Sequence, residues 1–360
     1  MIEINGISAL LKAVVDENLI QSEDGSFPAG HNGPHGDIET PVRTTSHALY
    51  MLCWLVDNGF YEYKEKANRA VDYLLSKQAR PMSASFWCRK NPEKDFNNGL
   101  VGQAWVFEAL LKAHEVLKRD DCYQIVEEVF LLHKWADDFS VWHSLNVDGS
   151  YNKINNTFNQ QLWFSYIGLS LKSEVAQERA TSFICNVLPY IEIYKDGTVF
   201  HDTLVIGERL KLNSSIRNNL IRVRHFIQKR TLLKEQRLRS VGYHGFNLIP
   251  MLYIRKLMPD LEFWKTIKFS KIVSVLNGKT FLEDMSANKY SFPYNPIGFE
   301  MAKLFELSND FVSAKKLIKM QLEYITITND RIAIAETEDV NNSLARLYEV
   351  CRIDLDRISG

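Results

Sequence analysis

The sequence predicts an all-α fold, an (α/α)6 toroid in which six inner helices are surrounded by outer ones. Six mostly apolar segments each begin with a polar cluster that contains Asn or His, near residues 44, 97, 159, 245, 295 and 341. More hydrophilic segments alternate with them, and a recurrence of about 50 residues is typical of repeated supersecondary units. Helices that are apolar all round are buried and one-sided helices lie outside them. The alternation therefore predicts a closed double ring.

The individual helices are predicted from apolar residues that recur with helical spacing. The first outer helix covers residues 7–19, where Ile7, Leu10, Leu11 and Val14 share one face. The pattern allows only short strands in loops, and the segments concerned are 191–194 and 198–201. The other predicted helices are, in chain order, 44–56 (inner), 61–78 (outer), 101–117 (inner), 122–137 (outer), 158–171 (inner), 173–190 (outer), one from 245 (inner), 261–276 (outer), one from 295 (inner), 310–324 (outer) and 341–350 (inner).

The start of the helix over 101–117 illustrates the polar clusters. Asn97 or Asn98 can cap this helix, because a side-chain oxygen there accepts a hydrogen bond from a free backbone N–H of the first turn. Gly99 and Gly102 leave no side chain over that turn, so a ligand can approach the backbone closely.

The third repeat is irregular, because a basic stretch, 203–241, lies between its outer helix and the fourth inner helix. Ten Lys and Arg residues there are opposed only by Glu208 and Glu235, and we predict a helical insertion. Its charge suits a solvated face, or a rim that meets an acidic polymer, a protein or a membrane surface. A nucleic-acid partner is not expected, since Phe226 is the single aromatic residue available for stacking on bases.

Composition excludes several classes of protein. The formal net charge of −1 favours neither nucleic-acid nor membrane-surface binding. No apolar run reaches the roughly 18 residues needed for a transmembrane segment, and residues 1–6 lack the features of a signal peptide. Five scattered cysteines without a CxxC pair indicate reduced thiols. We therefore expect a cytoplasmic protein that folds as a single domain over 1–360.

No cofactor or metal ion is expected. The chain contains no P-loop, GxGxxG or GxSxG motif. His31, His35 and His47 lie near Asp37 in the sequence, but their spacing matches no zinc motif.

The polar clusters predict a binding site for a carbohydrate. The inner helices of a double ring run parallel, so their N-terminal ends should face one cavity, although an Asn there is also an ordinary helix cap. Amides beside aromatic faces suit a sugar, whose hydroxyl groups need partners and whose C–H faces stack on rings. Arg43 can hold a substrate carboxylate, or pair with Asp37 or Glu39 instead. The candidate substrate-binding residues are Arg43, Trp87, Asn98, Gln103, Trp105, Asn159, Gln160, Trp163, His244, Asn247 and Tyr294.

Glycoside hydrolysis needs two carboxyl groups, one as acid and one as base or nucleophile. Asp37 and Glu39 lie in the long loop 21–43 before the first inner helix, and Asp95 precedes the second, so the three should lie side by side. The candidate pair is Asp95 with Asp37 or Glu39, although loop carboxylates also stabilise turns. Weaker candidates in later loops are Asp202, Glu283, Asp284, Glu336 and Glu338.

Two other functions fit the same residues. An epimerase or lyase would use His47, His244 or Tyr294 to move a proton at a sugar carbon beside a carboxylate. A non-catalytic protein of a polysaccharide assembly pathway would hold a glycan in the same cavity. The candidate catalytic residues are Asp95, Asp37, Glu39 and His47.

Four stretches resemble the six-hairpin glycosidase superfamily, namely residues 24–30 (DGSFPAG), 39–47 (ETPVRTTSH), 98–105 (NGLVGQAW) and 157–163 (TFNQQLW). This superfamily of toroids includes unsaturated glucuronyl and rhamnogalacturonyl hydrolases and, as relatives, the N-acylglucosamine 2-epimerases. The resemblance covers the first half of the chain and points to a subgroup associated with bacterial surface-polysaccharide production. It implies a glycoside hydrolase that acts on an acidic bacterial polysaccharide or oligosaccharide.

Overall fold

The computed structural model describes residues 6–155, 157–201, 233–286, 288–328 and 331–359, and it is mainly helical, as the sequence predicts. The chain forms two compact units, each assembled from separate stretches. Unit 1 comprises the described parts of Met1–Lys134, Ser144–Lys153 and Phe292–Gly360, and unit 2 comprises those of Trp135–His143 and Ile154–Ser291.

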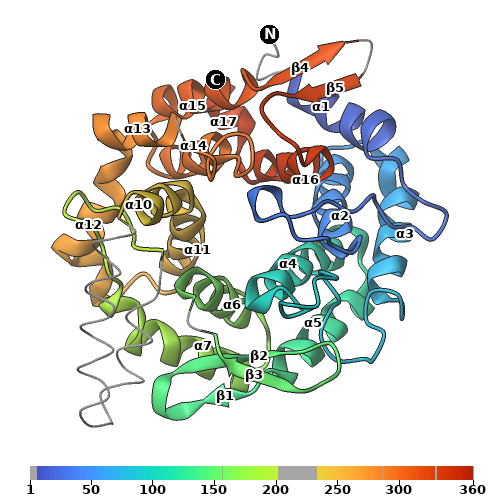
Figure 1. Cartoon of the computed structure of the whole chain (residues 1–360), viewed down its shortest axis with the longest axis horizontal. Coiled ribbons are helices and arrows are strands. Elements are labelled where there is room, and N and C mark those ends of the chain that lie inside the picture. The colour runs from blue at the N-terminus through green and yellow to red at the C-terminus, as the bar shows by residue number, and fades with distance from the viewer. Residues whose placement is uncertain (1–5, 156, 202–232, 287, 329–330, 360) are drawn as a thin grey trace. The chain divides into compact units, whose positions relative to one another are not determined.

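Unit 1 contains the two kinds of helix that the hydrophobic pattern predicts. Along α2 (Val42–Asp57) and most of α4 (Gly99–Leu117) nearly every residue is buried, and the two helices pack against each other. Helices α3 (Lys64–Leu75) and α5 (Asp120–Leu132) each bury residues along one side only. Helix α3 packs against α2, and α5 packs against α4 (Figure 1). The distinction between inner and outer helices in this part of the chain is therefore confirmed.

The C-terminal part of unit 1 continues the series of buried helices. Helix α14 (Ile297–Leu307) is buried and packs against the outer helix α15 (Phe311–Leu322). Helix α16 (Val340–Ala345) passes into the 3-10 helix η9 (Arg346–Arg352), which packs against both α14 and α2. The other helices of unit 1 are α1 (Ile7–Ala13), the π-helix η2 (Val14–Asn18), the 3-10 helices η3 (Gly33–His35) and η4 (Tyr61–Tyr63), and α17 (Leu355–Ser359).

In unit 2, helix α6 (Phe158–Ser170) packs against both α7 (Glu174–Asn186) and α11 (His244–Leu257). Trp163 of α6 donates its indole N–H to the backbone oxygen of Phe246 in α11 at 3.0 Å, so the N-terminal halves of these helices adjoin. The other helices of unit 2 are α10 (Leu233–Gly242), α12 (Ile267–Ser274), α13 (Lys279–Ser286), and the 3-10 helices η5 (Asp137–Phe139), η6 (Leu188–Tyr190), η7 (Glu262–Lys265) and η8 (Val275–Asn277).

The strands are short and lie in loops. Strands β1 (Trp135–Ala136), β2 (Val141–Leu145) and β3 (Tyr151–Ile154) form one sheet in that order, and β4 (Ile325–Thr328) pairs antiparallel with β5 (Arg331–Ile334). The segments 191–194 and 198–201, where the sequence allows short strands, form no named strand and are joined by a single bridge from Ile193 to Val199. The other strands were not predicted, because segments this short leave little alternation to detect.

Several predicted boundaries were wrong. Helix α5 ends at Leu132, not 137, because Trp135 pairs with Trp142 in the sheet instead. Helix α4 begins at Gly99, not 101, and Asn98 before it is left-handed with φ 55° and makes no side-chain cap. The cap comes from Asn97, whose Oδ1 accepts from the Gly99 N–H at 2.9 Å. The sequence pattern also missed α13 and α17, which are only 8 and 5 residues long.

The predicted basic insertion 203–241 lies outside the described residues as far as 232, and so does Asp202. In its described part, α10, Arg237 forms ion pairs with Asp196 at 2.7 Å and with Asp284 at 3.0 Å. This arginine is therefore balanced by acids of the same unit. No helix within the described ranges is long and apolar enough to cross a membrane.

A polar side chain in the first turns of several inner helices holds the backbone of the preceding loop. In α4, Gln103 accepts from the Phe86 N–H at 2.8 Å and donates to the Phe86 oxygen at 3.0 Å. In α6, Gln161 binds both backbone groups of Trp142 in the same way, at 3.0 and 2.8 Å. These buried amides satisfy backbone groups of the segments that precede α4 and α6.

Candidate functional site

The strongest candidate site lies in unit 1, where the starts of α2, α4 and α16 adjoin. Arg43 lies in the first turn of α2 and is only 1% exposed. Its Nη1 donates to Asn32 Oδ1 at 2.8 Å and to Glu39 Oε1 at 3.0 Å. The other oxygen of Glu39 accepts from Asn342 of α16 at 2.6 Å. The Arg43 guanidinium lies over Trp105 of α4, 4.3 Å from the ring centroid. Residues of α2, α4 and α16 thus surround one buried ion pair, that of Arg43 with Glu39.

One edge of the Arg43 guanidinium remains open. Its Nε and Nη2 are buried and have no hydrogen-bond partner among the described residues. Burial tends to lower the pKa of Arg43, but the charges and hydrogen bonds of Glu39 and Tyr294 together outweigh burial and raise the pKa, so the group stays charged. A buried N–H without a partner is costly. The Nε–Nη2 edge is also the edge that grips two oxygens of one group, which suits it to a ligand.

His47 lies one turn further along α2 and is also 1% exposed. Its ring stacks on Tyr348 of η9, with centroids 4.3 Å apart and planes at 12°, and meets Trp105 edge-on at 5.3 Å. Its Nε2 is buried and unpaired within the described chain. The pKa of His47 is held well below its ordinary value by burial and then by the positive charge of Arg43 and two further arginines. A neutral imidazole with a free nitrogen is able to accept a proton.

The two further arginines are Arg346 and Arg352, both buried. Arg346 forms an ion pair with Glu300 at 3.0 Å, and Arg352 forms ion pairs with Glu108 and Glu349. Buried charges require partners of this kind. Because these pairs join α4, α14 and η9, they also hold in place the helices around the candidate site.

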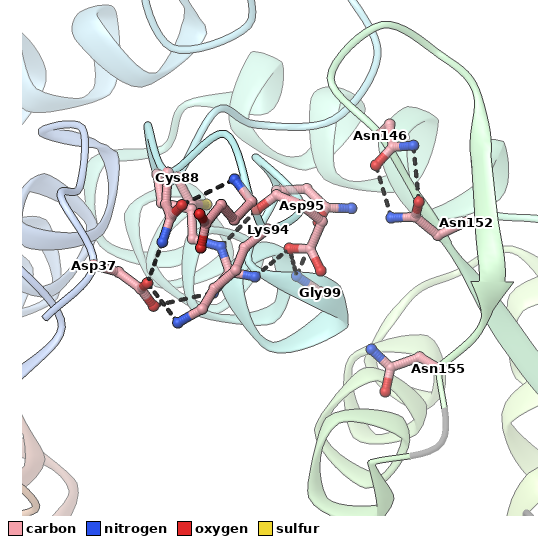
Figure 2. A network of polar contacts seen from close by, with 12 residues as sticks. Asp37, Cys88, Lys94, Asp95, Gly99, Asn146, Asn152 and Asn155 are labelled. Carbon is pink, nitrogen blue, oxygen red and sulfur yellow. Dashed lines mark hydrogen bonds and ion pairs between the residues drawn. The ribbon is translucent and has the colours of Figure 1, made fainter. Parts of the chain in front are cut away.

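Asp37 joins the loops that precede α2 and α4 (Figure 2). Its buried carboxylate accepts from Lys94 Nζ at 2.6 Å and pairs with Arg89 at 3.3 Å. The side-chain amides of Asn32 and Asn91 each donate to it at 3.0 Å. Burial tends to raise the pKa of Asp37, but these donors, Lys94 first, outweigh burial and lower the pKa to about 2. The carboxylate is therefore ionised at neutral pH, with both oxygens engaged.

Asp95 is bound by the same arginine as Asp37. Arg89 donates to Asp95 Oδ1 at 2.7 Å, and that oxygen also accepts from the N–H of Gly99 at 3.0 Å (Figure 2). The Asp95 side chain is 30% exposed, and its Oδ2 has no hydrogen-bond partner in the described part of the chain. The structure thus brings Asp37 and Asp95 to one arginine, whereas Glu39 belongs with Arg43.

Tyr294 and Asn98 lie beside these groups. The Tyr294 hydroxyl donates to Asn32 Oδ1 at 3.0 Å, and Asn32 also binds Arg43 and Asp37, so Tyr294 is part of the buried cluster. The Asn98 side chain makes no hydrogen bond to the described residues, and its left-handed backbone is a strained conformation for a residue other than glycine.

Gln103 and Trp87 have structural partners. Gln103 spends both ends of its amide on backbone groups, donating to the oxygen of Asn97 as well as binding Phe86. Trp87 is partly exposed in the loop and donates its indole N–H to the backbone oxygen of Arg89 at 2.9 Å. A sugar at Gln103 would have to displace bonds that hold the loop.

The remaining predicted residues, which lie in unit 2, are Asn159, Gln160, Trp163, His244 and Asn247. Trp163 and Phe246 have ring centroids 5.0 Å apart. Asn247 donates to the Tyr243 oxygen at 2.8 Å, while its buried Oδ1 has no partner among the described residues. Gln160 accepts from Asn155 at 2.7 Å. Asn159 is buried in the first turn of α6.

His244 is fully occupied. Its Nδ1 accepts from the N–H of Val199 at 3.1 Å, so the hydrogen lies on Nε2, which donates to the oxygen of Ile272 at 3.1 Å. Burial lowers the pKa of His244 to about 4. The ring is therefore neutral and stabilises two loop segments, in contrast to His47 with its free nitrogen.

The residues of the unit 1 cluster that sequence reasoning missed are Asn32, Arg89, Asn342 and Tyr348. Asn342 follows Asn341, which lies at the predicted start of the last inner helix, and the Asn341 amide donates to the oxygen of Ala29. Helical spacing does not distinguish two adjacent asparagines. The contact of Asn342 with Glu39 spans 303 residues of chain, and no local pattern reports it.

The chain is similar to a curated protein and to several solved structures. It is 32% identical to archaeal glycosylation protein Q of Haloferax volcanii over 369 aligned positions, which cover 98% of each protein. The structure resembles cellobiose 2-epimerase from Bacillus thermoamylovorans with a TM-score of 0.65, at 11% identity, over 98% of this chain and 99% of that one. It resembles the GH76 alpha-mannanase of Bacteroides thetaiotaomicron with a TM-score of 0.60, at 9% identity, over 97% and 95%. No family model matches the chain.

The two structural likenesses show the fold. Both extend over nearly the whole chain, and the two matched enzymes are (α/α)6 toroids, so the predicted fold class is confirmed. The predicted resemblance to toroidal glycosidases and sugar epimerases is confirmed at the level of the fold.

Proposed function

The chain belongs to the family of archaeal glycosylation protein Q, and we propose that it is an enzyme that acts on a carbohydrate in glycosylation. The name of the relative supports a role in building a glycan. The epimerase and mannanase with the same fold support a sugar as the substrate.

The reaction that the geometry supports best is proton transfer at a sugar carbon next to a carbonyl group, as in an epimerase or isomerase. One observation carries this proposal. Arg43 and His47 are both buried against Trp105, and in the described chain Arg43 Nε and Nη2 and His47 Nε2 have no hydrogen-bond partner. A fixed cation beside a neutral base is the arrangement that such a reaction needs.

In this proposal the two substrate oxygens, those of the carbonyl and of the adjacent hydroxyl, bind to the Nε–Nη2 edge of Arg43. His47 Nε2 takes the proton from the carbon that carries the hydroxyl, and the electron pair of that C–H bond forms an enediolate. The negative charge then lies on the oxygens that Arg43 binds, which lowers the barrier. Addition of a proton to the opposite face of the same carbon gives an epimer, and addition to the neighbouring carbon gives an isomer. The carboxylate of an acidic sugar, as predicted from the sequence, fits the same edge.

Hydrolysis is the second candidate, and Asp95 is the observation that favours it. Its Oδ2 is free of partners in the described chain and could activate water. A hydrolase also needs a protonated acid nearby. Asp37, with its pKa lowered to about 2, cannot supply that proton, and both oxygens of Glu39 already accept hydrogen bonds. The carboxylate pair is therefore less well supported than Arg43 and His47.

Deuterium exchange distinguishes these functions. The purified chain would be incubated in D2O with D-mannose, D-glucose, cellobiose, D-glucuronate and an α-1,6-mannobiose, and the products analysed by NMR. We expect at least one sugar to exchange its C2 proton for deuterium. His47→Asn should reduce that rate roughly 10²- to 10⁴-fold, whereas His114→Asn, at a histidine that contacts the Arg119 oxygen, should not.

Two other outcomes would indicate a different function. Cleavage of either disaccharide without incorporation of deuterium at C2 would establish a hydrolase. Binding of a sugar without exchange or cleavage would indicate a glycan-binding protein and contradict the proposal.

A further inference from the structure

The amide of Asn342 is fixed in one orientation. Its Nδ2 donates to Glu39 Oε2 at 2.6 Å and to Asp339 Oδ2 at 2.9 Å. Both partners are carboxylate oxygens, which only accept when ionised, so the nitrogen must face them. Its Oδ1 therefore points away from both carboxylates.

The loop before α2 packs closely against this amide. A Cβ atom at Gly30 would come within 2.7 Å of Asn342 Cγ and Nδ2, so the amide can approach the loop this closely only because residue 30 is glycine. The Asn342 backbone N–H donates to Asp339 Oδ1 at 3.3 Å, which caps α16. Backbone and side chain are thus held by the same aspartate.

The fixed amide leaves one acceptor without a donor. Asn342 is 1% exposed, and its Oδ1 has no hydrogen-bond partner among the described residues. Glu39 binds Asn342 with one oxygen and Arg43 with the other. The carboxylate of Glu39 therefore links the residue with the unpaired acceptor, Asn342, to the residue with the unpaired Nε and Nη2 donors, Arg43.

We infer that Asn342 is a specificity-determining residue that accepts a hydrogen bond from a substrate hydroxyl next to the two-oxygen group bound by Arg43. This inference rests on the proposed function and adds to it the class of substrate. The substrate is a sugar in which a hydroxyl donor adjoins a hydroxy-carbonyl or carboxylate group. A sugar that lacks this hydroxyl leaves Oδ1 buried and unpaired, which such a site rejects.

The test is the affinity of the full chain for sugars and their deoxy analogues, measured by titration calorimetry. The probes are D-glucose, D-mannose and D-glucuronate with their monodeoxy forms. In the unmodified chain, removal of one particular hydroxyl should weaken binding roughly 10-fold or more. In Asn342→Ala the parent sugar should bind more weakly, and that same deoxy form should bind as well as the parent.

The matched control is Asn341→Ala, the neighbouring asparagine whose amide binds the Ala29 oxygen. It should keep the discrimination of the unmodified chain. If Asn342→Ala does not fold, Asn342→Ser retains a hydroxyl donor for Glu39 and should show the same loss of discrimination. The inference is overturned if the Asn342 variants still bind the parent sugar more tightly than its deoxy form, or if the unmodified chain binds both equally. Either outcome leaves the proposed function standing. No binding by any probe overturns both.

Discussion

At the level of single residues, the first turns of the buried helices carry two kinds of polar side chain. Gln103 and His244 have both ends bound to backbone groups and hold loops in place. Arg43, His47 and Asn342 are equally buried but keep atoms without partners in the described chain. Because folding ordinarily satisfies buried polar atoms, the second kind marks the candidate site.

The stacking of Tyr348 on His47 should position the imidazole for proton transfer. Tyr348→Leu removes the ring that lies parallel to His47 at 4.3 Å, so the base can turn away from the substrate. We expect kcat to fall about tenfold or more with little change in KM, since misalignment of a base raises the barrier. Tyr348→Phe keeps the stacking and loses only the hydrogen bond from Arg352, so it should stay near the unmodified rate. Equal losses in both variants would contradict a positioning role.

Buried histidines should make the stability of the protein depend on pH. Burial lowers the pKa of His133 and His244 to about 4 and that of His47 well below 6.5. The unfolded chain binds these protons near pH 6.5, while the folded chain does not. The free energy of unfolding should therefore have its full value above about pH 6.5. It should fall as the pH is lowered towards 4, by about 1.4 kcal/mol per pH unit for each histidine.

Urea denaturation at pH 7 and pH 5 measures this slope. His244→Gln offers a control, because the amide can accept from Val199 and donate to Ile272 without titrating. It should flatten the slope by the share of one histidine. Asp37 does not interfere, since its pKa of about 2 confines its effect to pH values below about 4. An unchanged slope in His244→Gln would show that this histidine is not buried neutral.

At the level of elements, the two loops before α2 and α4 depend on each other. Asp37, in the first loop, binds Lys94 and Arg89 in the second. Backbone bonds join the same loops, from the N–H of Lys90 to the oxygen of Ile38 at 2.8 Å and from Thr40 to Cys88 at 3.0 Å. The carboxylate predicted to be catalytic is thus also the main link between the loops that carry the candidate site.

Asp37→Asn separates these two roles. As a link, Asp37 should be replaceable at a cost of about 1–2 kcal/mol of stability, because Lys94 is 41% exposed and can return to water while Arg89 keeps Asp95. Amide hydrogen exchange should then increase at residues 89–97, and turnover should stay within about tenfold of the unmodified chain. Asp95→Asn is the matched control on the same arginine. A loss of several orders of magnitude in either variant would favour the hydrolase.

At the level of the whole chain, the described residues form two compact units that share one polypeptide. The chain leaves unit 1 at Lys134, returns for Ser144–Lys153, leaves again and comes back at Phe292. Neither unit is a continuous stretch of sequence, and the stretches that form one unit are connected through residues of the other. The sequence-based prediction of a single domain over 1–360 is untested by this division.

Calorimetry tests that prediction. A chain threaded several times between two units should unfold in one cooperative transition, with a calorimetric enthalpy close to the van't Hoff enthalpy. Two resolved transitions, or a stable fragment that contains unit 2 alone after limited proteolysis, would show that the units are independent domains.

The pattern of the sequence was sufficient for the fold class. Apolar periodicity is a local property, so it located α2, α4, α6 and their outer partners to within a few residues. It also singled out Arg43, Glu39 and His47, since polar residues at the start of an apolar helix are conspicuous without any knowledge of contacts. Short strands and short helices escaped it, because a few residues carry too little periodicity.

Which of these polar residues remain open could be read only from the folded chain. Gln103 and Arg43 look alike in the sequence, as polar residues near the start of an apolar helix, yet the first is fully bound and the second is not. Their partners come from other loops and, for the Glu39–Asn342 contact, from 303 residues away. Hydrogen-bond satisfaction depends on distance in space, and distance in space is set by how the helices pack.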